Sequence, residues 1–242
     1  MIVRKLSSTI MGSLLIDCSL VKYASPMLQY NQPREQIQGV SMTPTDVTIR
    51  AMAPTEVPQV AQLLAQAYYH DVFFKWCVDS DKDRIAIVAA YYTIYIQSRG
   101  AVVHVATDSS KQLLGATVWL PHDGDADMYA DIIAAVGPAN APMFQEVAER
   151  SHANEPTGTP FYQLVGFGVT EAAQGRGIGH ALLKHNLDHW DVVGIPTYLE
   201  ASTPYTVGKG VYGKFGYLYH SPVMTFTDTA ILYPLYRKAG GN

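Results

Sequence analysis

The chain has 242 residues, of which 48% are hydrophobic and 16% are charged, and its formal net charge at pH 7 is −4. A chain of this length and apolar content can bury one sizeable core, so we expect one globular domain, over residues 42–242. The negative net charge and the scattered lysines and arginines argue against a nucleic-acid partner, which would require a basic surface.

The first 41 residues differ from the rest of the chain, and we expect them to form an extension that is disordered or loosely docked. A signal peptide is the alternative, because a basic start precedes an apolar run over residues 10–20. Asp17 and several serines interrupt that run, and no clear cleavage site follows it. The run is also too short to span a membrane, so no membrane partner is expected.

The cysteines and histidines indicate neither a disulfide framework nor a metal site. Cys18 and Cys77 are the two cysteines of the chain, which fits a reducing compartment and predicts a cytoplasmic protein. His185 and His189 share one expected helix, but no acidic third ligand is spaced to complete a metal site. A solvated helix face is the simpler interpretation, so no metal is expected.

Hydrophobic periodicity predicts a strand over residues 47–51, followed by a helix that Thr55 caps and whose apolar stripe consists of Val57, Val60, Ala61, Leu64 and Tyr68. A second helical stripe consists of Ile85, Val88, Ala89, Tyr92 and Ile96. Strand-like runs over residues 101–107 and 113–120 are joined by Asp108-Ser109-Ser110-Lys111, which predicts a hairpin.

The second half of the chain continues this alternation of helices and strands. Helices are expected over residues 127–136 and 143–150, separated by Gly137-Pro138. The remaining expected elements are a strand over 161–169, a helix over 177–190, a strand over 197–202, a short helix near Val211 and a final strand over 218–226. Hairpin strands combined with crossover helices predict an α/β fold with a central mixed β-sheet flanked by helices.

A turn rich in glycine joins the strand over 161–169 to the helix that follows it. This segment, Gly175-Arg176-Gly177-Ile178-Gly179, is called the glycine turn below. A helix start leaves about four amide N–H groups without intrahelical acceptors, and glycines let phosphate oxygens approach the backbone closely. Arg176 adds a positive charge beside these amides. The turn therefore predicts a pyrophosphate site, with a turn that holds no ligand as the alternative.

The spacing of the glycines in this turn distinguishes between the known classes of phosphate-binding motif. A dinucleotide-binding fold needs Gly-x-Gly-x-x-Gly and a P-loop needs Gly-Lys-Ser/Thr, and neither pattern is present. Gln174, Gly177 and Gly179, after a strand that ends in Val169, instead resemble the Gln-x-x-Gly-x-Gly acetyl-CoA-binding motif of the GNAT (Gcn5-related N-acetyltransferase) superfamily.

A second segment extends this resemblance, which covers roughly residues 46–226. The run Leu199-Glu200-Ala201-Ser202 is similar to a strand of GNAT proteins. Tyr212, Gly216 and Tyr217 are similar to the Tyr-x-x-x-Gly-Phe element that follows that strand in the family, where the tyrosine often lies near the CoA sulfur.

Within the superfamily, the segments 116–121, 161–164 and 199–202 look most like the branch that includes puromycin acetyltransferase. The chain departs from that branch in two places. Glu171 stands where a proline is usual, and the loop over residues 204–210 is longer, which leaves open whether Thr206 takes the place of a CoA-contacting polar residue.

The resemblance implies the GNAT fold, acetyl-CoA as the acetyl donor and a small-molecule primary amine as the acceptor. The cofactor-binding residues that it implies are Phe167, Gly168, Val169, Gln174, Gly175, Arg176, Gly177, Ile178, Gly179 and His180. Because the family places its variable substrate walls there, the expected acceptor-binding residues are Tyr68, Tyr69, Asp71 and Trp119. The oligomeric state stays open, a homodimer included.

Glu200 is the candidate general base, because an amine with a pKa of about 10.4 must lose a proton before it attacks a thioester. Its alternative role is to orient the substrate ammonium or to brace the sheet. Tyr212 is the candidate acid for the departing thiolate, with a core aromatic residue as the alternative. The predicted reaction is direct attack of the amine in a ternary complex.

Two other functions remain open at this point. A non-catalytic acyl-CoA-binding regulatory module would require only the glycine turn. A protein-lysine acetyltransferase would require an open groove for a peptide.

Overall fold

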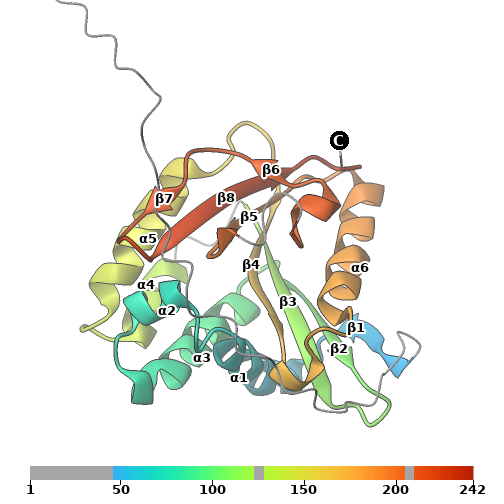
Figure 1. Ribbon diagram of the computed structural model, residues 1–242, viewed down its shortest axis with the longest axis horizontal. Helices are drawn as coiled ribbons and strands as arrows, with labels where there is room; N and C mark the ends of the chain where they lie inside the picture. The colour runs from blue at the N-terminus through green and yellow to red at the C-terminus, as the bar shows by residue number, and fades with distance from the viewer. Residues whose placement is uncertain (1–45, 123–127, 205–209, 242) are drawn as a thin grey trace, which may run out of the picture. The chain divides into compact units, whose positions relative to one another are not determined.

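The computed structural model describes residues 46–122, 128–204 and 210–241 (Figure 1). The expected extension over residues 1–41 lies outside these ranges, as does Thr206. Within them, strands and helices build a mixed β-sheet with helices on both faces, which confirms the fold class that the sequence predicts.

The strands of the sheet lie in the order β1 (Thr48–Ala51), β2 (Val102–Thr107), β3 (Leu113–Pro121), β4 (Tyr162–Val169), β5 (Thr197–Ala201), β8 (Ile231–Arg237) and β6 (Leu218–Tyr219). The short strand β7 (Met224–Thr225) pairs with β8 beside this path. Neighbouring strands are antiparallel except β4 and β5, which are parallel. A parallel pair needs a crossover connection, and helix α6 (Ile178–Val193) provides it.

Helices cover the two faces of the sheet unequally. α6 contacts β2, β3 and β4 on one face, whereas α1 (Val57–Ala67) contacts β3 and β4 on the other. The remaining helices, which lie on the side of α1 in Figure 1, are α2 (Val72–Cys77), α3 (Asp81–Gln97), α4 (Met128–Val136) and α5 (Ala141–Asn154). α3 packs against both α1 and α4.

Side-chain alternation along β3 assigns its residues to the two faces. Ala116 and Val118 belong to the core beneath α1 and α3. Thr117 and Trp119 point to the α6 side, where Thr117 accepts a hydrogen bond from Asn186 Nδ2 at 3.1 Å and Trp119 packs with Trp190. The sheet is therefore buried on both faces in its centre.

Two glycines of β4 allow α1 and α3 to approach the sheet closely. A Cβ at Gly168 would lie 2.9 Å from the Cβ of Ala67, and a Cβ at Gly166 would lie 3.1 Å from Tyr92. The contact at Gly168 is too close to exist without a shift of α1, and the contact at Gly166 would require the Tyr92 ring to shift by a few tenths of an ångström. A register shift between Val118 and Trp119 of β3 gives β4 a bulge in the same region, which increases its local bend.

β4 and β5 pair only at their beginnings. Their parallel register joins Tyr162, Gln163 and Leu164 to Thr197, Tyr198 and Leu199. Beyond Leu164, β4 remains paired with β3, and β5 remains paired with β8. The two strands therefore part in the middle of the sheet, and a gap opens there between residues 165–169 of β4 and the end of β5.

Three expectations about elements are corrected by the structure. The strand expected over residues 218–226 is replaced by the short strands β6 and β7, and the long final strand is β8. The six-residue helix α2 was not expected. Thr55 does not cap α1, because it lies inside a 3₁₀ turn over Pro54–Glu56, and Glu56 occupies the cap position instead.

Candidate active site

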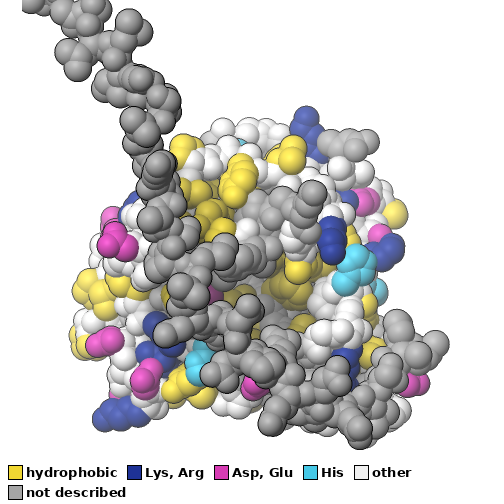
Figure 2. Space-filling model, viewed as in Figure 1, with side chains coloured by type: hydrophobic (Ala, Val, Ile, Leu, Met, Phe, Trp, Pro, Cys, Tyr) yellow, Lys and Arg dark blue, Asp and Glu magenta, His cyan; other side chains and the backbone are white. Residues whose placement is uncertain are grey.

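A cavity of about 980 Å³ lies where β4 and β5 part, and residues of both strands line it. It reaches the glycine turn, where Gln174, Gly175 and Gly177 contribute to its wall, and it also reaches α3, α4 and α5. Figure 2 shows this face of the molecule hollowed near its centre, with hydrophobic side chains gathered in the hollow. One continuous space thus joins the predicted phosphate site to the interior of the sheet.

The glycine turn presents unpaired amides to this cavity. Gly175 and Gly177 have φ angles of +77° and +78°, a conformation that side chains other than glycine rarely adopt. The amide of Ala181 is the first to bond within the helix, to the Gly177 carbonyl at 3.0 Å. Among the described residues, no backbone acceptor is bound by the amides from Gly175 to His180. This arrangement can hold an anion at the start of α6.

Side chains around the glycine turn leave it accessible. Gln174 is exposed, and its Nε2 donates to the Val169 carbonyl at 3.3 Å, which ties the turn to the end of β4. Arg176 is partly exposed and makes no ion pair with any residue in the described ranges. A Cβ at Gly179 would lie 2.9 Å from the Phe167 ring, so this glycine permits close packing of α6 on β4. His180 lies beside the Phe215 ring, at 4.7 Å between centroids.

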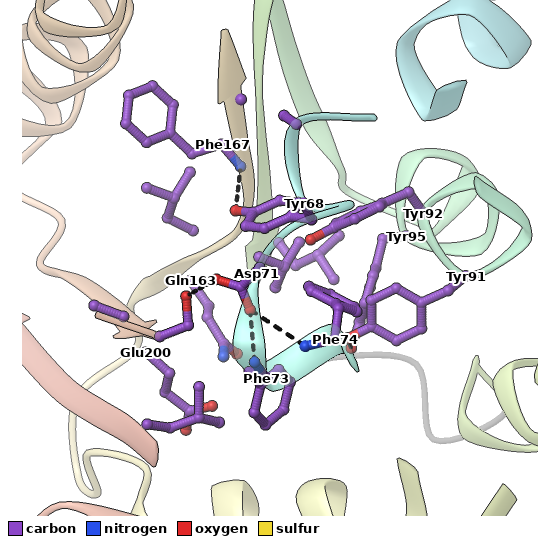
Figure 3. Close-up of a pocket in the computed structure, with 18 of the residues that line it drawn as sticks. Tyr68, Asp71, Phe73, Phe74, Tyr91, Tyr92, Tyr95, Gln163, Phe167 and Glu200 are labelled. Carbon is purple, nitrogen blue, oxygen red and sulfur yellow. Dashed lines mark hydrogen bonds between the residues drawn. The ribbon is translucent and has the colours of Figure 1, made fainter. Parts of the chain in front are cut away.

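On the edge of β4 that faces the gap, the Phe167 amide donates to a side chain and not to a neighbouring strand. The Phe167 N–H donates to the Tyr68 hydroxyl at 3.3 Å, as Figure 3 shows. Tyr68 stacks on Tyr92 with 5.6 Å between ring centroids, and burial raises the pKa of Tyr68 to about 12. Tyr68 therefore presents a neutral hydroxyl at the gap.

Glu200 lies at the end of β5 with its carboxylate in the cavity (Figure 3). Its Oε2 accepts from the Ser151 hydroxyl at 2.7 Å, and its Oε1 accepts from the Tyr198 hydroxyl at 2.9 Å. Burial raises the pKa of Glu200 to about 7; the two hydroxyl donors oppose this shift, and the charge of Glu155 adds to it. A carboxyl group with this pKa can exchange a proton near neutral pH.

Tyr212 also lines the cavity, immediately before the 3₁₀ turn over Gly213–Phe215. Its ring centroid lies 6.3 Å from that of Phe167 and 5.8 Å from that of Tyr217. Burial raises the pKa of Tyr212 well above its usual value, so the phenol is protonated at neutral pH. Within the described ranges its hydroxyl has no hydrogen-bond partner, which leaves it available to a ligand.

The four residues predicted to bind the acceptor have different surroundings. Tyr68 and Asp71 line the cavity. Asp71 Oδ1 accepts from the amides of Phe73 and Phe74 at the start of α2, and its Oδ2 accepts from the Ser202 hydroxyl at 2.6 Å (Figure 3).

Tyr69 and Trp119 are not among the described residues that line the cavity. The Arg84 guanidinium lies 5.4 Å from the centre of the Tyr69 ring. Trp119 is fully buried against Trp190, because the alternation along β3 turns it toward α6. Neither side chain can contact a ligand in the cavity as the structure stands.

A group of polar and charged residues that sequence reasoning did not identify lies around Glu200. This part of the cavity, the acidic chamber, is lined by Tyr91, Tyr95, His122, Ser151, Glu155 and Glu200. No lysine or arginine is found among the described residues that line the cavity. The sequence offered no local signal for Ser151 and Glu155, because their role depends on the packing of α5 against β5.

The described residues give two further findings about the molecule. In the ranges that the structure describes, no helix is both long and apolar enough to cross a membrane. The same ranges contain no cluster of three or more histidine, cysteine, aspartate or glutamate side chains arranged to hold a metal ion.

No family model and no curated protein matches the sequence. Solved structures do match. One is a protein from Corynebacterium glutamicum named histone acetyltransferase HPA2 and related acetyltransferase, with a TM-score of 0.60, 19% identity, and coverage of 80% of this chain and 97% of that one. Another is an agmatine N-acetyltransferase, with a TM-score of 0.58, 12% identity, and coverage of 80% and 99%.

A mosquito arylalkylamine N-acetyltransferase-like protein has a TM-score of 0.54 at 16% identity, over 79% of this chain and 99% of that one. Identities this low establish the fold alone, and the resemblance to the puromycin acetyltransferase branch stays a prediction. These matches and the mixed sheet flanked by helices show that the chain has the GNAT acetyltransferase fold.

Proposed function

We propose that this protein is an acetyl-CoA-dependent N-acetyltransferase that acts on a primary amine of a small molecule. The proposal depends above all on one observation: a single cavity joins the unpaired amides of the glycine turn to the carboxylate of Glu200. A donor held at the turn and an amine held at Glu200 would meet in the gap between β4 and β5. Neighbours in fold that are named for acetyl transfer to agmatine and to arylalkylamines support an amine as the acceptor.

The cofactor would occupy the glycine turn and the free edge of β4. The amides from Gly175 to His180 would bind the pyrophosphate, with Arg176 adding positive charge. The pantetheine arm would lie along Phe167, Gly168 and Val169 as an added strand, because β5 no longer pairs there. Acetyl-CoA supplies the acetyl group as a thioester. The Phe167 amide would polarise its carbonyl, in place of the long bond that it now donates to Tyr68.

Glu200 is assigned the role of general base. At pH 7 a carboxyl group with a pKa of about 7 is half ionised, and it is a stronger base than an ordinary glutamate with a pKa of about 4.3. The amine nitrogen attacks the thioester carbon, so that a C–N bond forms and the C–S bond breaks. The proton lost by nitrogen passes to Glu200, the departing thiolate takes a proton from the Tyr212 hydroxyl, and Tyr212 is reprotonated by the proton that Glu200 then releases.

The cavity supports a small amine over the two alternatives. A protein lysine would bring a peptide backbone with it, whereas the acidic chamber is lined by residues of α3, α5 and β5 within the cavity. A regulatory module that only binds acyl-CoA does not require a buried carboxyl group whose pKa is raised to about 7.

The test is a reaction of the full chain with acetyl-CoA and a panel of primary amines, followed by mass spectrometry of the amines. We expect at least one acetylated amine, formed together with free CoA. The matched variant Glu200→Gln should bind acetyl-CoA as well as the wild type but form product much more slowly. Release of CoA without any acetylated amine would contradict the proposal.

A further inference from the structure

Glu155 is a second carboxylate in the acidic chamber, and its contacts with its two histidine partners are long. It follows the last turn of α5 and retains 18% side-chain exposure. Its Oε2 lies 3.6 Å from His122 Nδ1 and 3.3 Å from His152 Nδ1. Its Oε1 has no hydrogen-bond partner among the described residues, so a cationic ligand could complete its coordination.

The two carboxylates of the acidic chamber lie close enough to influence each other. The charge of Glu155 raises the pKa of Glu200. Both charges also raise the pKa of Tyr95, which places the Tyr95 hydroxyl within range of the two groups. No lysine or arginine among the described lining residues offsets this negative charge.

The aromatic side chains that line this part of the cavity suit an extended cation. Tyr91 and Tyr95 contact each other, with 4.7 Å between ring centroids and 2.9 Å between hydroxyl oxygens. Phe144 packs on Tyr91 at 5.2 Å and also lines the cavity. Aromatic rings attract ammonium groups through their faces, and their carbon atoms pack on a methylene chain.

We infer that the acceptor is a diamine, or an amine with a guanidinium group at its far end, whose reacting nitrogen lies at Glu200 and whose second cation pairs with Glu155. The inference rests on the proposed acetyl transfer and names the class of its substrate. Glu155 is then a specificity-determining residue, because a monoamine would leave its carboxylate without a counter-charge.

The second cation also changes the proton equilibrium at Glu200. By neutralising Glu155 it removes one of the causes that hold the pKa of Glu200 high. A diamine should therefore be acetylated at a lower pH than a monoamine. The groups that face Glu200 from the packed elements, and that remain unchanged in this comparison, are Tyr91, Tyr95, Ser151 and Tyr198.

The experiment compares diaminobutane and diaminopentane with pentylamine and phenylethylamine as acceptors for the full chain. The variants are Glu155→Gln and, as a matched control, Glu149→Gln, which removes an exposed carboxylate of α5 outside the cavity. We expect kcat/KM for the diamines to exceed that for pentylamine about tenfold or more, the effect of one charged hydrogen bond. Glu155→Gln should abolish this preference, and Glu149→Gln should alter neither the preference nor the turnover of pentylamine.

The pH profile gives a second readout that a merely structural role of Glu155 would not change. In the wild type, the rise of kcat, which reports the enzyme–substrate complex, should fall at lower pH for the diamines than for pentylamine, and in Glu155→Gln the two should coincide. Equal or better use of pentylamine or phenylethylamine, or a diamine preference that survives in Glu155→Gln, would overturn the inference and leave the proposed function standing. If no amine is acetylated, both are wrong.

Discussion

At Glu200, opposing influences set the protonation of one carboxyl group. Burial and the charge of Glu155 raise its pKa, and the hydroxyls of Ser151 and Tyr198 lower it, with a net value of about 7. Because the folded pKa lies above that of a free glutamate, the ionised form is disfavoured in the fold and accumulates only as the pH rises through about 7. A base with this property is active above neutral pH and inactive below it.

The pH dependence of turnover tests this assignment. For a monoamine acceptor, kcat/KM should rise with pH and level off above about pH 7, as Glu200 becomes ionised. Glu200→Gln should lower kcat by roughly 10²- to 10⁴-fold and remove that rise, because the amide cannot accept the proton. A rise at the same pH in the variant would assign it to another group.

Tyr212 provides a separate test of thiolate protonation. Tyr212→Phe keeps the ring that packs near Phe167 and Tyr217 but removes the hydroxyl. We expect kcat to fall by roughly tenfold or more while the affinity for acetyl-CoA changes little, since the lost interaction acts on developing charge. The matched control is Tyr217→Phe. It also removes one buried tyrosine hydroxyl, but that hydroxyl donates to Thr197 in the core, so any loss of fold stability should appear without a specific loss of turnover. Turnover unchanged across pH in Tyr212→Phe would exclude the acid role.

At the scale of residues, the sequence can predict a functional group whose role depends only on residues nearby in the chain. The glycine turn could be inferred because the start of a helix and the positions of its glycines are local properties. Glu155 and Ser151 could not, because their role depends on α5 lying against β5, a contact between residues 49 positions apart in the case of Ser151 and Glu200. Trp119 was expected in the pocket because the family resemblance places substrate walls there, and its face of β3 could not be assigned without knowing where the helices pack.

At the scale of elements, one ion pair joins α6 to β8. The Arg237 guanidinium bonds both oxygens of Asp191, at 2.6 and 2.7 Å, and its Nε donates to the Phe215 carbonyl. Arg237 lowers the pKa of Asp191 below its ordinary value. The pair therefore stabilises the fold above the pKa of an unfolded aspartate, about 3.9, and this stabilisation is lost as the pH falls through the lower folded value.

Asp191→Asn should destabilise the protein by about 3 kcal/mol at pH 7, because it leaves the buried Arg237 charge without its partner. The control is Asp188→Asn on the same helix, which breaks the exposed pair with Lys184 and should cost about 0–1 kcal/mol. Urea unfolding at pH 7 measures both. Equal effects of the two substitutions would show that the connection between α6 and β8 is not stabilising.

The order of elements from β1 to β5 follows the sequence prediction closely, since those segments have strong helical or strand periodicity. The prediction is wrong at the C-terminal end. Pro234 lies within β8, and a proline inside an apolar run argues against a strand, so Ile231–Arg237 was not recognised. β8 nevertheless contains this proline and pairs with β5 on one side and with β6 on the other. α2, at six residues, is too short to show a period.

At the scale of the whole molecule, the candidate function depends on strands that part. The mixed sheet could be predicted, and Gly166 and Gly168 are consistent with a splayed or bulged edge of β4, but the point where the β4–β5 pairing stops, after three residue pairs, could not be predicted. The gap places the start of α6, the edge of β4 and the acidic chamber around one cavity. Each of these has an ordinary structural role alone, and together they can hold a donor and an acceptor.

The central claim is that the glycine turn binds acetyl-CoA, and one pair of substitutions on α6 isolates it. Gly177 precedes the first residue of the helix and Gly194 follows the last, with φ angles of +78° and +73°. A Cβ built at either glycine has no atom within 4 Å outside its chain neighbours. Tryptophan at either position therefore has a similar backbone cost, about 1–2 kcal/mol, but only at Gly177 would it cover the turn.

The measurement is calorimetric titration of acetyl-CoA into the full chain. We expect the wild type and Gly194→Trp to bind with equal affinity and one ligand per chain, and Gly177→Trp to lose binding while remaining folded. Absence of binding by the folded wild type, or equal binding by Gly177→Trp, would contradict the account.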